Sequence, residues 1–229
     1  MTDWLRERYS DVERPACDAA YLRNLHPAIS AIQSQIEADA AREQEPITDR
    51  ASARFLAMLV RVSGSRQALE IGTNLGYSAS WIAGALPPDG LLTCVDINSD
   101  LLERARAAWS RGGIVGQIET HCGKALDVLQ RLPGPYDFAY IDANKEDYQG
   151  YLDAVIDRLR PGGVVAVDNL LWGGQAAKDP DDVSQLRETT PLIRAFNRSF
   201  LDDPRLDSTI VQIGDGIGIG VTRSGRRTG

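Results

Sequence analysis

The hydrophobic positions of the chain fall into short blocks that alternate between two periods. Compact apolar runs, typical of buried strands, are followed by stretches whose apolar residues recur every three or four positions, as in helices. The strands predicted in this way are Gln67–Ile71, Leu91–Ile97, Gln117–Cys122, Tyr136–Ile141 and Val164–Val167. The helices that follow the first four are Tyr77–Leu86, Asn98–Arg111, Ala125–Arg131 and Glu146–Leu159. This alternation predicts a parallel sheet with helices on both faces.

The two ends of the chain depart from this alternation. Near the N-terminus an amphipathic helix is predicted from four apolar residues at helical spacing, Leu25, Ile29, Ile32 and Ile36. A break over residues 45–49 and a second helix that ends near Gly64 follow. We therefore predict a helical extension over residues 1–45 and a single α/β domain over residues 46–229.

The C-terminal part begins with a polar stretch, Gly173–Glu188. A helix is predicted over Pro191–Leu201, and two alternating runs follow, Ser208–Ile213 and Gly216–Thr222. Gly214 and Asp215 separate these runs. An Asp-Gly pair between two alternating runs, here Asp215 and Gly216, favours a hairpin. The sheet is therefore expected to end in antiparallel strands at one edge.

Charge and composition narrow the class of protein. The chain has 229 residues, with 25 Lys and Arg against 32 Asp and Glu, for a formal net charge of −7. An acidic balance disfavours partners held through nucleic-acid phosphates or anionic lipid. No apolar run reaches the roughly 18 residues of a membrane span, and the N-terminal residues have no signal-peptide pattern. We therefore expect a cytoplasmic protein without a membrane or nucleic-acid partner.

Cysteine and histidine are scarce. The cysteines are Cys17, Cys94 and Cys122, an odd number without C-x-x-C spacing, which favours reduced thiols. Cys94 and Cys122 lie in strand-like runs, so we expect both to be buried. The only histidines are His26 and His121, and neither lies in a motif.

A glycine-rich turn follows the first predicted strand. Gly72 and Gly76 are spaced G-x-x-x-G, which differs from both the dinucleotide fingerprint and the Walker motif. Acidic residues accompany it: Glu70 precedes the turn, and Asp96 lies near the end of the second strand. An acid at the second strand end can accept the hydroxyls of a ribose. The alternative is that Asp96 only caps the next helix.

A second polar group lies at the ends of the fourth and fifth predicted strands. Asp142 follows the fourth, and Asp168 and Asn169 follow the fifth. Neighbouring parallel strands bring their carboxyl ends to one edge, so two carboxylates and an amide oxygen are expected to meet there. Such an oxygen set favours Mg²⁺, Ca²⁺ or Mn²⁺ over Zn²⁺. The alternative is that these residues only cap turns and a helix.

Several motifs, taken in order, resemble one known family. The segment LEIGTNLGYS, residues 69–78, is very similar to the L-E-I-G-T-x-x-G-Y-S pattern of the cation-dependent O-methyltransferases, the family of caffeoyl-CoA and catechol O-methyltransferases. The segments IDANKEDY, residues 141–148, and VDNLLWGG, residues 167–174, also resemble that family. The resemblance covers about residues 45–222. It implies a Rossmann-like class I methyltransferase fold, with a mostly parallel seven-stranded sheet and an antiparallel C-terminal edge.

The resemblance implies methyl transfer from S-adenosylmethionine to a hydroxyl of a small, catechol-like or acyl-thioester acceptor. It implies Asp142, Asp168 and Asn169 as metal ligands, and Lys145 beside the reacting hydroxyl. Lys145, Asp142 and Asn169 are the predicted catalytic residues. The predicted cofactor-binding residues are Thr48, Glu70, Gly72, Thr73, Asn74, Ser78, Asp96, Ile97, Ala125 and Asp142. A homodimer is also implied, with residues 1–45 and 173–190 near the acceptor or the dimer contact.

The chemistry is consistent with this resemblance. Transfer from a sulfonium is an in-line displacement, so placing the acceptor oxygen is a large part of catalysis. A divalent ion would lower the pKa of a bound hydroxyl. Because histidine is scarce, Lys145 is the candidate base, although it could also be a solvated helix residue. Trp172 follows the metal pair on a loop and is expected either to cover the substrate or to pack in the core.

Two residues depart from the family pattern. Asn144 stands where the family usually has Asp, and Lys124 stands where an acid is frequent. Neither is a predicted ligand, so altered surroundings are expected rather than lost activity. The competing interpretations are an NAD-dependent dehydrogenase, an N-methyltransferase of nucleic acid or protein, and a cofactor-binding domain without catalysis. The missing G-x-G-x-x-G motif argues against the dehydrogenase, and the residues Asp142 to Lys145 replace the Asn-Pro-Pro-Tyr often found in N-methyltransferases.

Overall fold

The computed structural model describes residues 21–22, 24–178 and 188–223. The chain divides into two compact units, Met1–Ser30 and Ala31–Gly229. In the first unit the described residues Tyr21, Leu22, Asn24 and Leu25 are helical and exposed. The larger unit begins at Ala31, so the helix that starts there belongs to the domain.

The larger unit is built on one sheet of seven strands in the order β3-β2-β1-β4-β5-β7-β6. The strands are β1 (Gln67–Ile71), β2 (Leu91–Asp96), β3 (Ile118–Cys122), β4 (Tyr136–Ile141), β5 (Leu159–Val167), β6 (Leu206–Val211) and β7 (Ile217–Thr222). Neighbours from β3 to β5 are parallel, whereas β7 is antiparallel to both β5 and β6. The predicted fold class is therefore confirmed. The strand order reverses between β1 and β4, and open α/β sheets bind ligands at such a switch point.

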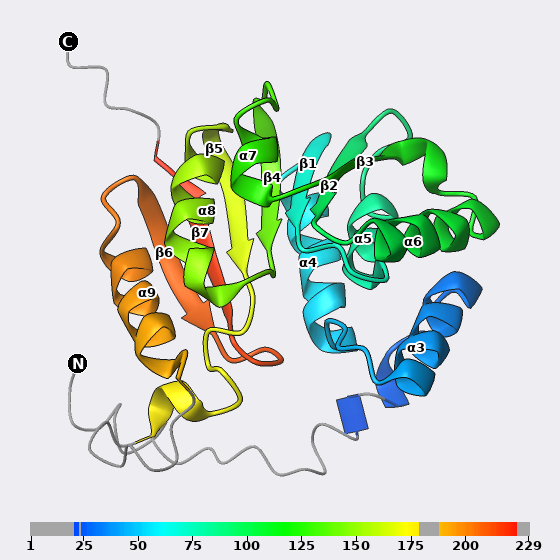
Figure 1. Ribbon diagram of the computed structural model, residues 1–229, viewed down its shortest axis with the longest axis horizontal. Coiled ribbons are helices and arrows are strands. Elements are labelled where there is room, and N and C mark those ends of the chain that lie inside the picture. The colour runs from blue at the N-terminus through cyan, green and yellow to red at the C-terminus, as the bar shows by residue number, and fades with distance from the viewer. Residues whose placement is uncertain (1–20, 23, 179–187, 224–229) are drawn as a thin grey trace. The chain divides into compact units, whose positions relative to one another are not determined.

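Helices cover both faces of this sheet, and Figure 1 shows α8 and α9 at one side of the view and α5 and α6 at the other. The helices are α3 (Ala31–Glu43), α4 (Arg50–Val62), α5 (Tyr77–Ala83), α6 (Ser99–Arg111), α7 (Ala125–Leu129), α8 (Tyr148–Ile156) and α9 (Thr190–Asp202). Short 3-10 turns are η1 (Val115–Gln117), η2 (Lys145–Asp147) and η3 (Gln175–Ala177). Of the helices described, none is both long and apolar enough to cross a bilayer.

Alternating side chains of the strands build two cores, because successive residues of a strand point to opposite faces. On β4, Ala139 and Ile141 join a core with residues of α7, α8 and α9. Phe138 and Tyr140 point to the other face and join a core with residues of α4, α5 and α6. Tyr140 is thus the last residue of β4 that faces the α4 side.

Two of the helices that flank the switch point begin with side-chain caps. The Oδ1 atom of Asp49 accepts from the backbone N of Ala51 at 2.8 Å and from that of Ser52 at 3.1 Å, which starts α4. Asn98 does the same for α6. Asp and Asn satisfy the free N–H groups of a first helical turn in this way, and the caps fix where the loops before α4 and α6 turn toward the sheet.

The first predicted helix is partly wrong. Ile32 and Ile36 lie on α3, but Leu25 and Ile29 precede it, and Leu25 is 60% exposed. Pro27 lies between the two halves of the predicted helix, and a proline disfavours helical backbone at the residue before it. The three- and four-residue spacing of the apolar residues therefore continues from Leu25 to Ile36, although α3 begins only at Ala31.

Strand β5 starts at Leu159, earlier than the predicted Val164. Leu159 pairs with Tyr136, and a register shift lies between Tyr136 and Phe138 on the partner strand. The glycines and proline of residues 161–163, interpreted as a helix stop, are accommodated inside an irregular strand. As a result α8 ends at Ile156, before the predicted boundary.

The remaining differences are local. The connection between β6 and β7 runs over residues 212–216 and is longer than the predicted Gly214-Asp215 turn, although the hairpin itself is confirmed. Cys94 is buried as expected, but Cys122 is exposed, because it ends the edge strand β3. Cys17 and residues 179–187 of the polar stretch lie outside the described residues.

Candidate active site

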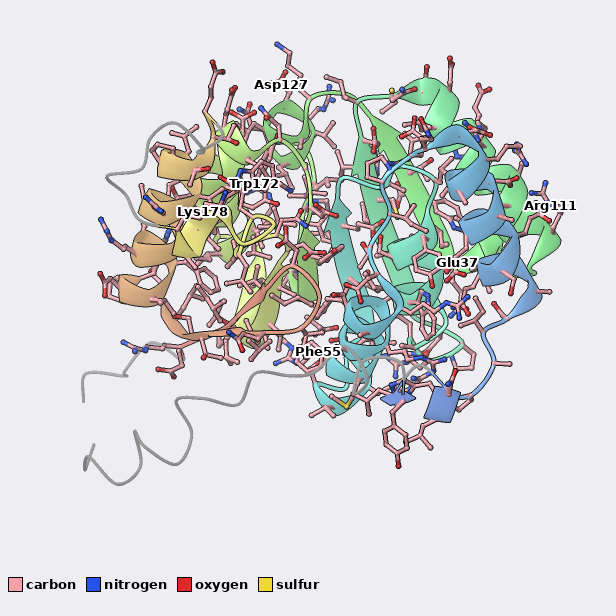
Figure 2. All side chains as sticks on the ribbon, turned by 90° about the horizontal axis from the view of Figure 1, so that it is seen from below. Glu37, Phe55, Arg111, Asp127, Trp172 and Lys178 are labelled. Carbon is pink, nitrogen blue, oxygen red and sulfur yellow. The ribbon has the colours of Figure 1, made fainter. Side chains whose placement is uncertain are left out.

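The carboxyl ends of β1, β2, β4 and β5 border a cavity of about 1350 Å³. Pockets for a single drug-sized ligand are roughly 300–1,000 Å³, so this one has room for a cofactor and a second molecule. Figure 2 labels two of its lining residues, Trp172 on the segment after β5 and Asp127 on α7. The cavity lies at the switch point between β1 and β4, where the fold predicts a ligand.

The glycine-rich turn passes very close to β4. Gly72 has φ +92°, and a Cβ on it would lie 1.9 Å from the carbonyl oxygen of Asp142. The backbone N of Asp142 donates to the carbonyl of Ile71 at 2.9 Å, which ties the two strand ends together. Only glycine allows this approach. The close approach therefore places Asp142 directly beside the glycine-rich turn.

Asp96 organises the next wall of the cavity. Its Oδ2 atom accepts from the backbone N of Asn74 at 2.8 Å, and its Oδ1 atom accepts from the backbone N of Asn98 at 2.8 Å. The cap of α6 is Asn98 rather than Asp96, so the capping alternative for Asp96 is wrong. Ile97 follows it at the cavity wall and is 68% exposed.

The other predicted cofactor residues lie mostly around the same cavity. The lining includes Thr48, Thr73, Asn74, Ser78 and Ala125. It also includes Lys124, which stands where the family often has an acid. Asn74 has φ +47°, and its Nδ2 atom donates to the carbonyl of Pro46 at 3.0 Å. This bond joins the loop before α4 to the glycine-rich turn.

Glu70 is the exception among the predicted cofactor residues. It is fully buried and is not among the described residues that line the cavity. The Sγ atom of Cys94 donates to its Oε2 atom at 3.3 Å, whereas Oε1 lacks a hydrogen-bond partner among the described residues. Burial raises the pKa of Glu70 to about 8, opposed by hydrogen bonds from Ser78, Cys94 and Thr73. A carboxyl in this position favours its neutral form.

The second polar group centres on Lys145. Its Nζ atom donates to Asp142 Oδ1 at 3.0 Å, to Asn169 Oδ1 at 2.6 Å and to the hydroxyl of Tyr148 at 2.5 Å. These three acceptors match the three protons of an ammonium. The side chain of Lys145 is 12% exposed, so the alternative of a solvated lysine is wrong. The structure thus brings together residues from the ends of β4 and β5, as predicted.

Asp168 completes this group from β5. Its Oδ1 atom accepts from the backbone N of Asn169 at 2.7 Å, and its Oδ2 atom accepts from the hydroxyl of Tyr140 at 2.5 Å. Burial, and next the negative charge of Asp142, raise the pKa of Asp168 to about 6. A nearby cation would oppose this shift, because an opposite charge favours the ionised form of a carboxyl.

The donor set can be tested against the divalent ion that the resemblance implies. Within the described residues no group of three or more His, Cys, Asp and Glu is arranged to hold a metal. The predicted set has only two carboxylates and adds the amide of Asn169. An ammonium already bridges Asp142 and Asn169, which marks a place where positive charge is stabilised. Oxygen atoms of this kind fit a hard cation such as Mg²⁺.

Trp172 lies on the loop that follows this group. It has φ +54° and lines the cavity, and the ammonium of Lys145 lies 5.9 Å from the centre of its ring. The β6–β7 connection holds the loop, because the backbone N of Gly173 donates to Asp215 Oδ1 at 2.6 Å and that of Leu171 donates to the carbonyl of Asp215 at 2.8 Å. Trp172 also packs against the core, as one of the two alternatives predicted, while it lines the cavity.

The sequence patterns missed three residues of this site, Tyr140, Tyr148 and Asp215. The rings of both tyrosines lie in the apolar cores, Tyr140 on β4 and Tyr148 on α8. The hydroxyl of Tyr148 donates to the carbonyl oxygen of Asp168 at 3.1 Å. Asp215 was interpreted only as part of a turn. The available signal was one tyrosine two residues before the predicted ligand Asp142 and another three residues after Lys145, since buried hydroxyls need partners.

Comparison with known proteins decides the family. A family model described as O-methyltransferase matches residues 26–223. The chain belongs to the O-methyltransferase family. This O-methyltransferase is 34% identical over 174 residues to caffeoyl-CoA O-methyltransferase 2 of Petunia hybrida, covering 72% of this chain and 71% of that protein. It is also 34% identical over 176 residues to the caffeoyl-CoA O-methyltransferase of Medicago sativa, covering 72% and 70%.

Solved structures agree with this assignment. The O-methyltransferase TomG from Streptomyces achromogenes, involved in tomaymycin synthesis and solved in complex with SAM, has a TM-score of 0.80 and 29% identity, covering 90% of this chain and 95% of that one. The O-methyltransferase from Bacillus cereus, solved in complex with SAH, has a TM-score of 0.79 and 26% identity, covering 89% and 96%. By family and fold, the enzyme is an S-adenosylmethionine-dependent O-methyltransferase. The dehydrogenase and the domain without catalysis are thereby set aside.

Proposed function

We propose that this O-methyltransferase requires a divalent cation and methylates a hydroxyl of a small acceptor that is neutral or cationic. The single observation that carries the metal requirement is that Asp142, Asp168 and Asn169 line the same cavity, where the ammonium of Lys145 bridges Asp142 and Asn169. Burial and the negative charge of Asp142 raise the pKa of Asp168, so a bound cation would stabilise the ionised form of Asp168. Mg²⁺, Mn²⁺ and Ca²⁺ all suit oxygen ligands of this kind.

The cofactor is proposed to lie along the glycine-rich turn. Asp96 accepts from two backbone N–H groups and keeps lone pairs for ribose hydroxyls. Thr48, Gly72, Thr73, Asn74 and Ser78 line the neighbouring wall, which suits the amino-acid end of the cofactor. Ile97 and Ala125 offer apolar surface for the adenine.

Lys145 is proposed as the group that takes the proton from the acceptor hydroxyl. When bound, a divalent cation would supply charge that lowers the pKa of that hydroxyl. Lys145 lies against both Asp142 and Asn169, so it adjoins the place where the hydroxyl would be held. To act as a base its Nζ atom must give up one of the three protons that it donates in this structure. Trp172 is proposed to cover the acceptor and exclude water.

The charge of the cavity favours neutral or cationic acceptors. Among its described lining residues are seven aspartates and two lysines: Asp49, Asp96, Asp127, Asp142, Asp147, Asp168, Asp215, Lys124 and Lys145. A divalent cation and a sulfonium cofactor would offset only part of this negative charge. Acyl-CoA thioesters carry several phosphate charges, and phosphate sites are built from Arg, Lys or helix N-termini. We therefore expect catechols and catechol amines to be better acceptors than caffeoyl-CoA.

One assay tests both parts of the proposal. Methyl transfer from labelled S-adenosylmethionine is measured with catechol, dopamine, caffeic acid and caffeoyl-CoA, with EDTA and with added Mg²⁺. We expect EDTA to abolish turnover, Mg²⁺ to restore it, and kcat/KM to be about tenfold or more higher for catechol or dopamine than for caffeoyl-CoA, since one misplaced buried charge costs this much or more. Unchanged turnover in EDTA would contradict the metal requirement, and caffeoyl-CoA as the best acceptor would contradict the acceptor class.

A charge variant provides the matched control. Asp147 lines the cavity and accepts from Asn144 Nδ2 at 3.1 Å and from the hydroxyl of Tyr151 at 3.3 Å. The Asp147→Asn change keeps the shape but removes one negative charge. It should raise kcat/KM for caffeoyl-CoA relative to catechol. A uniform change for both acceptors would show that charge does not set the preference.

We also propose that the enzyme is a cytoplasmic homodimer, as the family resemblance implies. Met58 and Val62 on α4 are exposed apolar side chains, 50% and 81% exposed, that a second copy could cover. Light scattering at micromolar concentration tests this, and a monomer would contradict it.

A further inference from the structure

Tyr140 carries a buried hydroxyl that connects the two halves of the site. Tyr140 is the last residue of β4 whose side chain points toward α4, and it is fully buried. Its hydroxyl donates to Asp168 Oδ2 at 2.5 Å and lies 3.1 Å from Thr48 Oγ1. Thr48 lines the cavity at the proposed cofactor end, whereas Asp168 belongs to the proposed metal group. A single side chain thus touches both.

The direction of these hydrogen bonds follows from proton counting. The phenol of Tyr140 has a single proton, and its hydroxyl points it at Asp168 Oδ2, because a carboxylate oxygen accepts. That proton is donated to Asp168, so the hydroxyl of Thr48 must donate to the oxygen of Tyr140. The chain therefore runs from Thr48 through Tyr140 to Asp168. The Oγ1 atom of Thr48 keeps lone pairs with which to accept from a ligand.

The carboxylate at the end of this chain is held on both sides. Oδ1 accepts from the backbone N of Asn169 and Oδ2 accepts from Tyr140. Each carboxylate oxygen has a second lone pair, so both bonds can persist while the group faces a cation. Without the tyrosine hydroxyl, Oδ2 would be a buried acceptor free to rotate toward another partner.

We propose that Tyr140 is a positioning residue that orients Asp168 for the divalent cation and couples this orientation to cofactor contact at Thr48. The inference rests on the proposed function, because it assumes a cation at Asp168 and a cofactor at Thr48. Hydrogen-bonded partners of metal-binding side chains typically change metal affinity about 10- to 100-fold. Bonds in a chain also strengthen one another, so a ligand that donates to Thr48 reinforces the bond at Asp168.

The test is a calorimetric titration of Mg²⁺ into the full-length enzyme, with and without S-adenosylhomocysteine. This product lacks the sulfonium charge, so it does not repel the cation directly. Wild type is compared with Tyr140→Phe, which removes both bonds, and with Thr48→Val, which removes only the cofactor end. Tyr136→Phe is the matched control, since it removes another buried hydroxyl from the opposite end of β4.

For wild type we expect the product to tighten Mg²⁺ binding by about fivefold or more, with Mg²⁺ tightening product binding by the same factor. Tyr140→Phe should weaken Mg²⁺ binding about tenfold and lose the enhancement. Thr48→Val should keep the Mg²⁺ affinity measured without product but also lose the enhancement. Tyr136→Phe should behave as wild type, even where its melting temperature falls.

The outcomes separate the inference from the proposed function. If Tyr140→Phe retains both the wild-type affinity and the enhancement, Tyr140 has no positioning role. If Tyr140→Phe does not fold, Thr48→Val decides, and an undiminished enhancement in that variant overturns the coupling. If wild type does not bind Mg²⁺ at all, the proposed metal requirement fails and the inference fails with it.

Discussion

At the end of β1, the backbone of Gly72 approaches β4 so closely that an added Cβ would lie 1.9 Å from the carbonyl oxygen of Asp142. Gly72→Ala must therefore displace one of the two strand ends that border the cavity. A displacement of about 1 Å at reacting groups can cost on the order of 100-fold in rate. We expect kcat/KM to fall by about that factor, with S-adenosylhomocysteine binding weakened in calorimetry.

Gly113 provides the control for backbone strain. It has φ +72°, similar to Gly72, but a Cβ there would meet nothing within 4 Å. Gly113→Ala therefore carries the cost of a left-handed backbone without a clash. It should lower stability and leave product affinity unchanged. Equal losses of affinity in both variants would show that strain, and not the approach to Asp142, explains the effect.

At the scale of single residues, the sequence predicted the acidic and amide side chains of the site better than the side chains that hydrogen-bond with them. Asp142, Asp168 and Asn169 line one cavity as expected, because strand ends of a parallel sheet share one edge, and Lys145, expected there only from the family resemblance, bonds to two of them. Tyr140 and Tyr148 were missed, because their rings satisfy the apolar pattern and a pattern does not register a hydroxyl. Glu70 was expected in the cavity but lies beneath the turn, since strand alternation directs it toward the buried thiol of Cys94.

At the scale of elements, α6 tests how much a cap contributes by itself. The Oδ1 atom of Asn98 accepts from the backbone N of Asp100 at 3.0 Å and of Leu101 at 3.2 Å, and the side chain is outside the described cavity lining. Asn98→Ala should lower the free energy of unfolding by about 1 kcal/mol. Its backbone N still donates to Asp96, so product affinity should stay within about twofold. Urea denaturation and calorimetry measure the two effects, and a large loss of affinity would mean that the side chain also orients Asp96.

Element types were predicted more accurately than element boundaries. All five parallel strands and the closing hairpin are present, and the apolar runs of β1, β2 and β4 are buried on both faces of the sheet. The boundaries moved where glycine and proline were interpreted as stops, as in Pro161 to Gly163 of β5. Pairing with Tyr136 and the adjacent register shift keep these residues in the strand, and no local pattern reports a partner strand.

At the scale of the whole molecule, Glu70 links stability to pH. Its pKa is raised to about 8 by burial, from 4.5 in an unfolded chain. Between these values the folded state binds more protons than the unfolded state, so stability falls as pH rises from about 5 to 8 and then levels off. The loss is on the order of a few kcal/mol, since one pKa unit corresponds to about 1.4 kcal/mol. Glu70→Gln should flatten this dependence and make the variant more stable than wild type at pH 8.

The measurement is urea denaturation between pH 5 and 9, in EDTA so that cations do not contribute. Glu103→Gln, an exposed acid on α6, is the control and should leave the curve of wild type unchanged. Parallel curves for wild type and Glu70→Gln would show that Glu70 is ionised in the folded enzyme.

The position of β7 has a consequence for how the enzyme is made. This strand follows β6 in the chain but pairs between β5 and β6, and its preceding loop accepts hydrogen bonds from Leu170 and Leu171 just after Asp168 and Asn169. During synthesis the outer edge of β5 must therefore wait, unpaired, until β7 has left the ribosome. An open strand edge invites association with other chains. A nascent chain that stalls before Ile217 would expose this edge and leave the segment after Asp168 and Asn169 without its hydrogen bonds to the β6–β7 loop, so the cavity wall formed by this segment is completed only when the last strand is made.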